Sequence, residues 1–280
     1  MARFSGSMQA FFLAGALMVG AAGGAAAADL TLPVPPPIEP VAAPAPFSGW
    51  YLRGDVGVGI NEMSNFSSTD ASFVPGFQYD GAGLGTQAII GAGVGYQFNN
   101  WFRADVTGEY RTESKFWANE GYNGGVGDVG GDGYSGSARS TVVLANGYFD
   151  IGTWYGFTPF VGGGVGAAFQ QFHALTDIGL GPNNVGAYGI APDRNLVQFA
   201  WALMAGVDYS ILPNWKIELS YRYLDMGNIS SYPIACTAGC TNESQSFHMA
   251  SHDVRLGLRY VFAEVPLPAP PLQGPVVSKY

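Results

Sequence analysis

Charged side chains are scarce in this chain. Asp, Glu, Lys and Arg make up 12% of its 280 residues, against about a quarter in an ordinary soluble domain. The 12 Lys and Arg residues are outnumbered by 21 Asp and Glu residues, which gives a net charge of −9. Because binding to phosphates needs a surplus of basic side chains, nucleic acid is not expected as a partner. The 14% share of aromatic residues argues against disorder.

Long apolar runs are also missing after the first part of the chain. A membrane-spanning helix needs about 20 predominantly apolar residues, and no later window provides them. The one apolar stretch, residues 10–19, follows the basic residue Arg3 and leads to a run of alanines that ends at Ala28. This order is typical of a secretory signal peptide, so we expect residues 1–28 to be removed. A membrane-anchoring helix is the alternative, which the short apolar run disfavours.

Residues that bind metals or act as nucleophiles are few. Cys236 and Cys240 are the two cysteines, and in an exported chain they indicate a small disulfide loop. A metal site is poorly supported, because no second Cys or His pair lies nearby in sequence. The nearest approach to a catalytic triad is Ser251, His252 and Asp253, but neighbours along a strand point to opposite faces. We therefore expect no enzymatic activity and no cofactor.

Glycine and proline, in contrast, are abundant. Pro-rich segments, residues 29–47 and 263–280, flank the body of the chain and indicate extended tethers. The segment 162–167 matches the glycine pattern of a dinucleotide site, but no helix or acidic partner follows it. Asp128 and Asp132 lie in a glycine-rich segment and suggest calcium, yet they are too sparse for about six to eight oxygen ligands. A flexible exposed loop is the favoured interpretation there.

Alternation of apolar and polar residues dominates the rest of the chain. In the segment 50–58, Leu52 and Val56 share one face, whereas Arg53 and Asp55 share the other. This pattern indicates a strand with one apolar and one polar face. Each such run has the ten or so residues that a tilted strand needs to cross a bilayer. Eight runs are found: 49–60, 86–98, 101–112, 139–151, 157–170, 196–209, 214–225 and 250–262.

The connections between these runs alternate in length. The long ones are 61–85, 113–138, 171–195 and 226–249, and the short ones are 99–100, 152–156 and 210–213. Aromatic residues gather next to the short connections, where an interfacial girdle is expected. We therefore predict an all-β fold for residues 48–262: an eight-stranded antiparallel up-and-down transmembrane β-barrel with four long external loops. With an even number of strands, both termini lie in the periplasm.

Four motifs resemble a known family: Trp50–Gly54, Thr158–Gly166, Glu218–Asp225 and Arg255–Phe262. They are similar to the small porin-like, opacity-type outer-membrane β-barrel surface proteins of alphaproteobacteria. The resemblance covers essentially the whole mature body and implies a Gram-negative outer-membrane location. It also implies a barrel-assembly signal in the closing strand, formed by Leu256, Leu258, Tyr260 and Phe262. The extension 263–280 departs from the family, whose members usually end at the position of Phe262.

The polar faces of the runs carry charges that should meet inside the barrel. An unpaired buried charge would cost several kcal/mol, so we expect ion pairs. A gated ion path is one interpretation, but eight strands leave an interior just wide enough for side chains, which favours a structural network. Glycines on the lumen faces should make room for these side chains. The expected lumen charge network comprises Arg53, Asp55, Arg103, Asp105, Glu109, Arg111, Asp150, Asp208, Lys216, Glu218, Arg222, Asp253, Arg255 and Arg259.

Three contacts are expected within this network. Asp150 should lie near Arg103, Lys216 near Asp208, and Arg53 near Asp253 or Arg255 across the barrel closure.

The function expected from these features is that of a structural outer-membrane surface protein. It would support envelope integrity and mediate surface interaction or adhesion through its extracellular loops. A narrow porin-like channel for small solutes or ions is the alternative. Expected partners are outer-membrane lipid and lipopolysaccharide, the barrel-assembly machinery, and host or envelope ligands on the loops. The ligand and the oligomeric state are left open.

Overall fold

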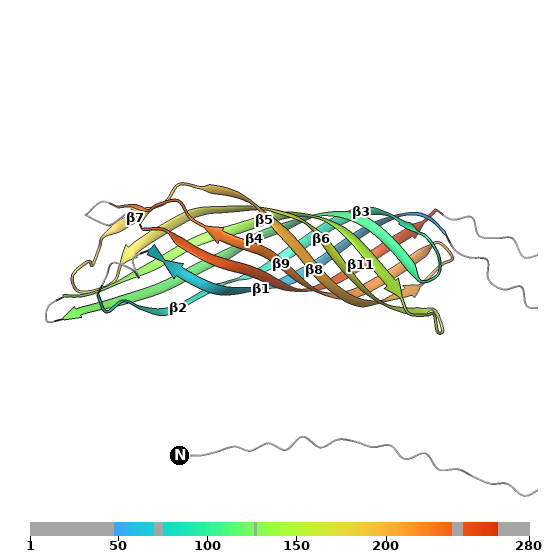
Figure 1. Cartoon of the computed structure of the whole chain (residues 1–280), viewed down its shortest axis with the longest axis horizontal. Coiled ribbons are helices and arrows are strands. Elements are labelled where there is room, and N and C mark those ends of the chain that lie inside the picture. The colour runs from blue at the N-terminus through green and yellow to red at the C-terminus, as the bar shows by residue number, and fades with distance from the viewer. Residues whose placement is uncertain (1–47, 70–74, 126–127, 237–242, 263–280) are drawn as a thin grey trace, which may run out of the picture. The chain divides into compact units, whose positions relative to one another are not determined.

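The computed structural model describes residues 48–69, 75–125, 128–236 and 243–262. The expected signal peptide, both Pro-rich tethers and Cys240 lie outside these residues. None of the described segments is a helix long and apolar enough to cross a membrane. The described residues form one antiparallel sheet of eleven strands (Figure 1). The strands are β1 Gly49–Ser68, β2 Gln78–Leu84, β3 Thr86–Gln97, β4 Phe102–Gly125, β5 Asp128–Asp150, β6 Phe157–Gly179, β7 Tyr188–Ile190, β8 Arg194–Ser210, β9 Trp215–Ser230, β10 Ala235–Cys236 and β11 Gln245–Val261.

Eight of the strands close into a ring. Their order around it is β1-β3-β4-β5-β6-β8-β9-β11, and β11 pairs with β1 to complete it. Every neighbouring pair in the ring is antiparallel, and at the closure Leu52 lies opposite Tyr260. A closed ring satisfies the backbone hydrogen bonds of all its strands, as a membrane environment requires. The prediction of eight strands is therefore incomplete, because β2, β7 and β10 add three short strands to the sheet.

The strands extend much further than predicted at the end with the long connections. β4 and β5 have 24 and 23 residues, and they pair from Phe102↔Phe149 to Gly125↔Asp128. The expected loop 113–138 is thus almost entirely a β-hairpin, and the expectation of a flexible loop there was wrong. The many glycines hid the strand pattern, because a residue without a side chain reveals no face.

Buried and exposed residues alternate along each strand, with polarity reversed from that of a soluble protein. On β1, Trp50 and Leu52 are 61% and 51% exposed, whereas Arg53 and Asp55 are 7% and 4% exposed. The exposed side chains form an apolar outer wall, and the buried charges lie inside the ring. This is the arrangement of a barrel whose outer wall faces lipid.

The apolar wall ends partway along β4. Val106 and Tyr110 are exposed apolar residues on its outer face, and Glu113 and Lys115 are exposed charged residues further along. About ten residues of a tilted strand suffice to cross a bilayer, so the membrane-spanning part of β4 ends near Tyr110. We call the part beyond this point the outer extension. It consists of residues 113–138 and of the segments of β2 and β6 that pair with them.

Candidate functional site: the barrel interior

The structure places all fourteen residues of the lumen charge network inside the ring. Thirteen are buried and Lys216 is half-buried. Seven of the fourteen side chains are basic and seven are acidic, so with ordinary charges the set is neutral. Such a balance is what a buried network needs, because an uncompensated charge would be costly. Ion pairs connect the network along the barrel in three groups, described from the short turns outward.

Arg103 is the centre of the group nearest the short turns. Its Nε lies 3.2 Å from Asp150 Oδ1, and its Nη2 lies 3.6 Å from Asp208 Oδ2. Its guanidinium also lies over two aromatic rings, 4.2 Å from the centroid of Tyr148 and 4.6 Å from that of Phe160. Cation–π contacts of this kind strengthen when water is excluded. Arg103 is thus held by charges and by rings at once.

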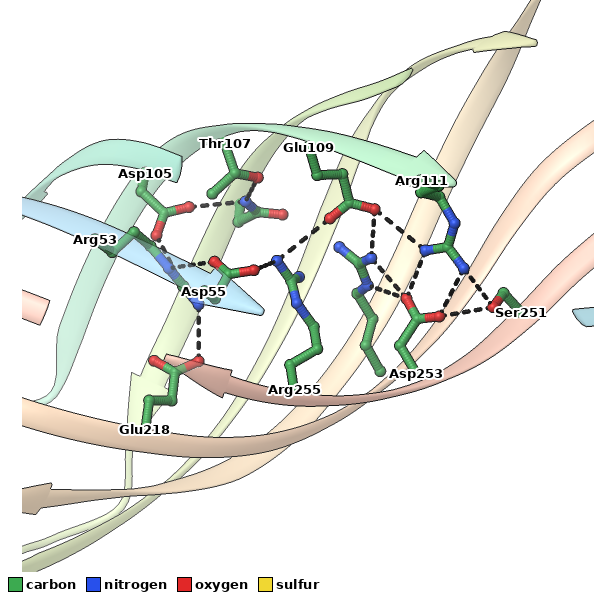
Figure 2. A network of polar contacts seen from close by, with 12 residues as sticks. Arg53, Asp55, Asp105, Thr107, Glu109, Arg111, Glu218, Ser251, Asp253 and Arg255 are labelled. Atoms are coloured by element: carbon green, nitrogen blue, oxygen red, sulfur yellow. Dashed lines mark hydrogen bonds and ion pairs between the residues drawn. The ribbon is translucent and has the colours of Figure 1, made fainter. Parts of the chain in front are cut away.

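The middle group links strands on opposite sides of the ring (Figure 2). Arg53 donates to Asp105 at 3.2 Å and to Glu218 at 2.9 Å. Arg255 is hydrogen-bonded to Asp55 and lies 3.3 Å from Glu109 Oε2. These contacts join β1, β4, β9 and β11. Side chains therefore fill the section of the lumen that a solute would have to cross.

The third group surrounds Asp253, which accepts hydrogen bonds from two arginines (Figure 2). Arg111 donates to its Oδ1 at 2.8 Å, and Arg222 donates to its Oδ2 at 2.6 Å. Arg222 also donates to Glu109 at 2.6 Å. Ser251 Oγ donates to Asp253 Oδ1 at 2.6 Å. Because Glu109 also pairs with Arg255, this group is continuous with the middle one.

The expected contacts within the network have mixed outcomes. The contact between Arg103 and Asp150 is confirmed. The expected position of Arg53 is confirmed in part. Arg53 and Arg255 lie near each other because both pair with Asp55, but the other partners of Arg53 are Asp105 and Glu218 rather than Asp253. Lys216 lies close enough to Asp208 for their charges to interact, as expected. The ion pairs of Asp208, however, are with Arg259 and Arg103.

The unexpected acidic partners of Arg53 have a geometric cause. Asp105 and Glu218 lie on strands that are two positions away around the ring, where long side chains meet across the curved wall. Sequence position gives the face of each residue, but it does not give that distance across the lumen.

Glycines leave the space that these side chains occupy. A Cβ at Gly59 would lie 2.3 Å from Nη2 of Arg111, and one at Gly95 would lie 2.4 Å from the ring of Tyr51. Both distances are far below van der Waals contact, so neither position accepts a larger residue without displacing the charged or aromatic group. The expected role of the lumen glycines is confirmed at these positions.

An apolar cluster that was not predicted fills the lumen further out. Phe116 and Phe247 stack with 5.3 Å between ring centroids and 8° between planes. Phe172 meets them edge-on at 5.3 and 5.9 Å, and Leu175 is buried in the same cluster. We call Phe116, Phe172 and Phe247 the aromatic plug; each is at most 2% exposed. The sequence signal for this cluster is the alternation of apolar and polar residues within the expected loops 113–138, 171–195 and 226–249.

All three histidines are outside the lumen, each beside an acidic residue. For His248 and His252 this residue is on a neighbouring strand, whereas His173 of β6 reaches Glu113 of β4, two strands away. His252 Nε2 lies 3.3 Å from Glu62, and its Nδ1 lies 2.6 Å from the hydroxyl of Tyr221. Ser251 and Asp253 face inward, so the three consecutive residues 251–253 do not converge. The other two pairs are His173–Glu113 at 3.0 Å and His248–Asp225 at 2.9 Å. Among the described residues, no group of three His, Cys, Asp or Glu side chains could hold a metal ion.

The remaining predicted residues lie at the two ends of the barrel. The assembly-signal residues Leu256, Leu258 and Phe262 are exposed on the outer wall and Tyr260 is half-exposed there, which gives the alternation its apolar face. Cys236 is in β10. Its bond to Cys240 stays a prediction, since Cys240 lies outside the described residues.

Comparison with known proteins agrees with this geometry. The chain is 30% identical over 273 residues to an uncharacterized protein of Brucella abortus, and the match covers 85% of this chain and 93% of the relative. Outer membrane protein PagN of Salmonella typhimurium is 28% identical, with 76% and 90% covered. A putative adhesin of Rickettsia prowazekii is 26% identical, with 75% and 86% covered.

The family model of the outer membrane protein β-barrel domain matches residues 13–262. This range includes every strand of the ring and all the groups that fill its interior. The chain therefore belongs to the family of outer-membrane β-barrel proteins, which implies that it resides in the outer membrane of a Gram-negative bacterium.

Proposed function

We propose that this protein is a structural surface protein, in which a plugged barrel holds the outer extension on the cell surface for adhesion or related interactions. The single observation that carries the proposal is the filling of the lumen at two levels. A neutral network of buried ion pairs occupies the membrane-spanning part, and the aromatic plug occupies the section beyond it. A filled interior favours a structural role of the barrel over the transport of solutes or ions.

The physical argument concerns water. Eight strands leave an interior just wide enough for side chains, and arginines such as Arg103 and Arg222 are at most 1% exposed. A hydrated ion would have to break several buried ion pairs at once. Each broken pair leaves a buried charge without its partner, which costs free energy. It would then meet Phe116 and Phe247, which offer no polar partner. A channel function therefore requires rearrangement at both levels.

The outer extension supplies the surface for the proposed interactions. The strands β4 and β5 continue well past the apolar wall as a paired hairpin, so they project a rigid surface rather than loose loops. A relative that is matched over 86% of its length carries the name putative adhesin. We extend that role to this chain and propose that it acts without catalysis.

The remaining parts of the proposal concern export and topology. We propose that residues 1–28 are a signal peptide. We also propose that the chain is an opacity-type protein and that the barrel-assembly machinery recognises its closing strand. Both termini then lie in the periplasm, the outer extension faces outward, and Cys236 bonds to Cys240.

The experiment combines conductance with adhesion. Purified protein in a planar bilayer should be silent or flicker, while cells that express it should bind host cells or matrix more than cells carrying the empty vector. A variant that lacks residues 116–135 but retains the ring should lose this binding. Stable conductance on the nanosiemens scale from the unmodified protein would refute the structural role and support a channel function. Equal binding by the two kinds of cells would refute the adhesive role.

A further inference from the structure

The outermost layer of the lumen contains two acidic side chains in contact. Glu120 of β4 is 5% exposed, and Glu243, just before β11, is 2% exposed. Their carboxyl groups are within hydrogen-bond reach of each other. Two ionised carboxylates at this distance repel strongly in a buried setting, so the contact requires a proton between them.

The hydrogen bonds around the pair leave room for that proton. The hydroxyl of Tyr134 donates to Glu120 Oε1 at 2.5 Å. Glu120 Oε2 is buried and accepts no hydrogen bond from any donor among the described residues. Ser68 donates to Glu243 Oε1 at 2.9 Å, and Gln245 donates to the same oxygen. A buried oxygen without a donor is costly, and protonation of the pair provides the missing hydrogen bond.

The groups that face the pair reinforce this need. Asp132 of β5 raises the pKa of Glu120 further, and Asp177 of β6 is buried opposite Tyr134 in the strand register. The basic side chains of this region are directed elsewhere: Lys115 and Arg139 are exposed on the outer wall, and Arg194 donates to the carbonyl of Ser231. This layer therefore differs from the balanced network in the membrane.

We propose that Glu120 and Glu243 form a proton-sharing latch, which holds the outer end of β4 against the start of β11 and releases it when the pH rises. The latch is separate from the proposed adhesive role, since it concerns the stability of the outer extension and not its ligand. It lies beyond the aromatic plug, so its release leaves the membrane-spanning ring closed.

The direction of the pH effect follows from the burial. Burial first, and the neighbouring carboxylates next, raise the pKa of Glu120 to about 9 from its usual 4.5. The folded state then binds more protons than the unfolded state between these two values. The contribution of Glu120 to stability is fully present below about pH 4.5, falls as the pH rises, and is lost above about pH 9. The latch is thus closed in acidic surroundings and opens in alkaline ones.

Hydrogen exchange of the full-length protein in detergent tests the latch. After correction for intrinsic rates, amide exchange over residues 116–122 and 243–247 should rise about tenfold or more from pH ~6 to pH ~10 in the wild type. In Glu120→Gln, where the amide can donate to Glu243 without titrating, the rise should be less than about twofold. The matched control is Glu113→Gln on the same strand, whose side chain is exposed, and it should behave as the wild type does.

An infrared titration of the unmodified protein keeps the proposal falsifiable if Glu120→Gln fails to fold. The band of a protonated carboxylic acid should be present at neutral pH and disappear at alkaline pH, together with the rise in exchange. A wild type without this band at neutral pH would overturn the latch. Exchange that is independent of pH, or Glu113→Gln that loses the dependence as Glu120→Gln does, would overturn it as well.

Discussion

Arg103 illustrates how much one side chain holds together in this barrel. It is fully buried, pairs with Asp150 and Asp208, and lies over the ring of Tyr148. Removal of its charge leaves these carboxylates only partly compensated. Arg103→Ala should therefore lower the free energy of unfolding by about 3–5 kcal/mol. Thermal unfolding in detergent, followed by the mobility of unboiled samples, measures this change.

A second arginine serves as the control for that experiment. Arg139 is exposed on the outer wall and donates to Gln171 at 2.5 Å. Arg139→Ala should cost at most about 1 kcal/mol, as exposed polar contacts do. Equal melting of the two variants would show that the lumen network does not stabilise the barrel.

Cys236 allows a test of the predicted disulfide. A bond to Cys240 would close a ring of about five residues, for which chain entropy gives only about 2 kcal/mol. Because the effect is local to the last outer connection, Cys236→Ser should insert and fold as the wild type does. Membrane fractionation and heat-dependent gel mobility check this outcome. Loss of insertion would mean that the bond is needed for assembly.

The sequence allowed the face of each charged residue to be predicted, because strands alternate strictly. Arg53 and Asp55 follow this rule, and both are buried as expected. Their partners were harder to predict, since Arg53 reaches Glu218 across the lumen rather than along a neighbouring strand. The acidic pair Glu120–Glu243 was missed for another reason. Its two members are 123 positions apart in the sequence, and the fold alone brings them together.

At the scale of elements, the β4–β5 hairpin is divided between two environments. Its first part belongs to the wall that faces lipid, and its outer part is stabilised by apolar contacts inside the barrel, with Phe116 at their centre. Phe116→Ala should cost about 3–5 kcal/mol in the outer extension, because it leaves a cavity where three rings meet. Hydrogen exchange should therefore increase in residues 113–138 while the membrane-spanning segments stay protected.

Phe169 provides the comparison for that variant. It lies on the outer wall of β6 and is 48% exposed, so Phe169→Ala opens no internal cavity. Exchange in the outer extension should be unchanged by it. Uniform loss of protection throughout the barrel in Phe116→Ala would show that the two parts unfold together.

Strand ends were predictable at one end of the barrel and not at the other. At the short turns, predicted and observed limits agree within about two residues, as for β6, which begins at Phe157 as expected. Proline, asparagine and aromatic residues mark those turns clearly. At the outer end, β6 continues to Gly179 rather than stopping at residue 170. The outer end of β6 is stabilised by pairing with β5 and by packing against the aromatic plug. The pattern of one segment does not show which other segments it will contact.

At the scale of the whole molecule, the closed ring predicts resistance to detergent. Every ring strand is paired on both sides, so no edge offers a point of entry. An unboiled sample extracted from membranes should therefore run faster on a denaturing gel than a boiled one. Identical mobility of the two samples would contradict a closed barrel.

The pairing of β1 with β11 also determines the order of events during biogenesis. Leu52 and Tyr260 are neighbours in the wall although 208 positions separate them. The first ring strand to leave the ribosome therefore waits for the last one, and contacts so distant in sequence form slowly. Until β11 arrives, two strand edges remain open to other chains. A chain that is truncated anywhere before β11 should thus be a substrate for periplasmic proteases and chaperones, however complete its other strands are.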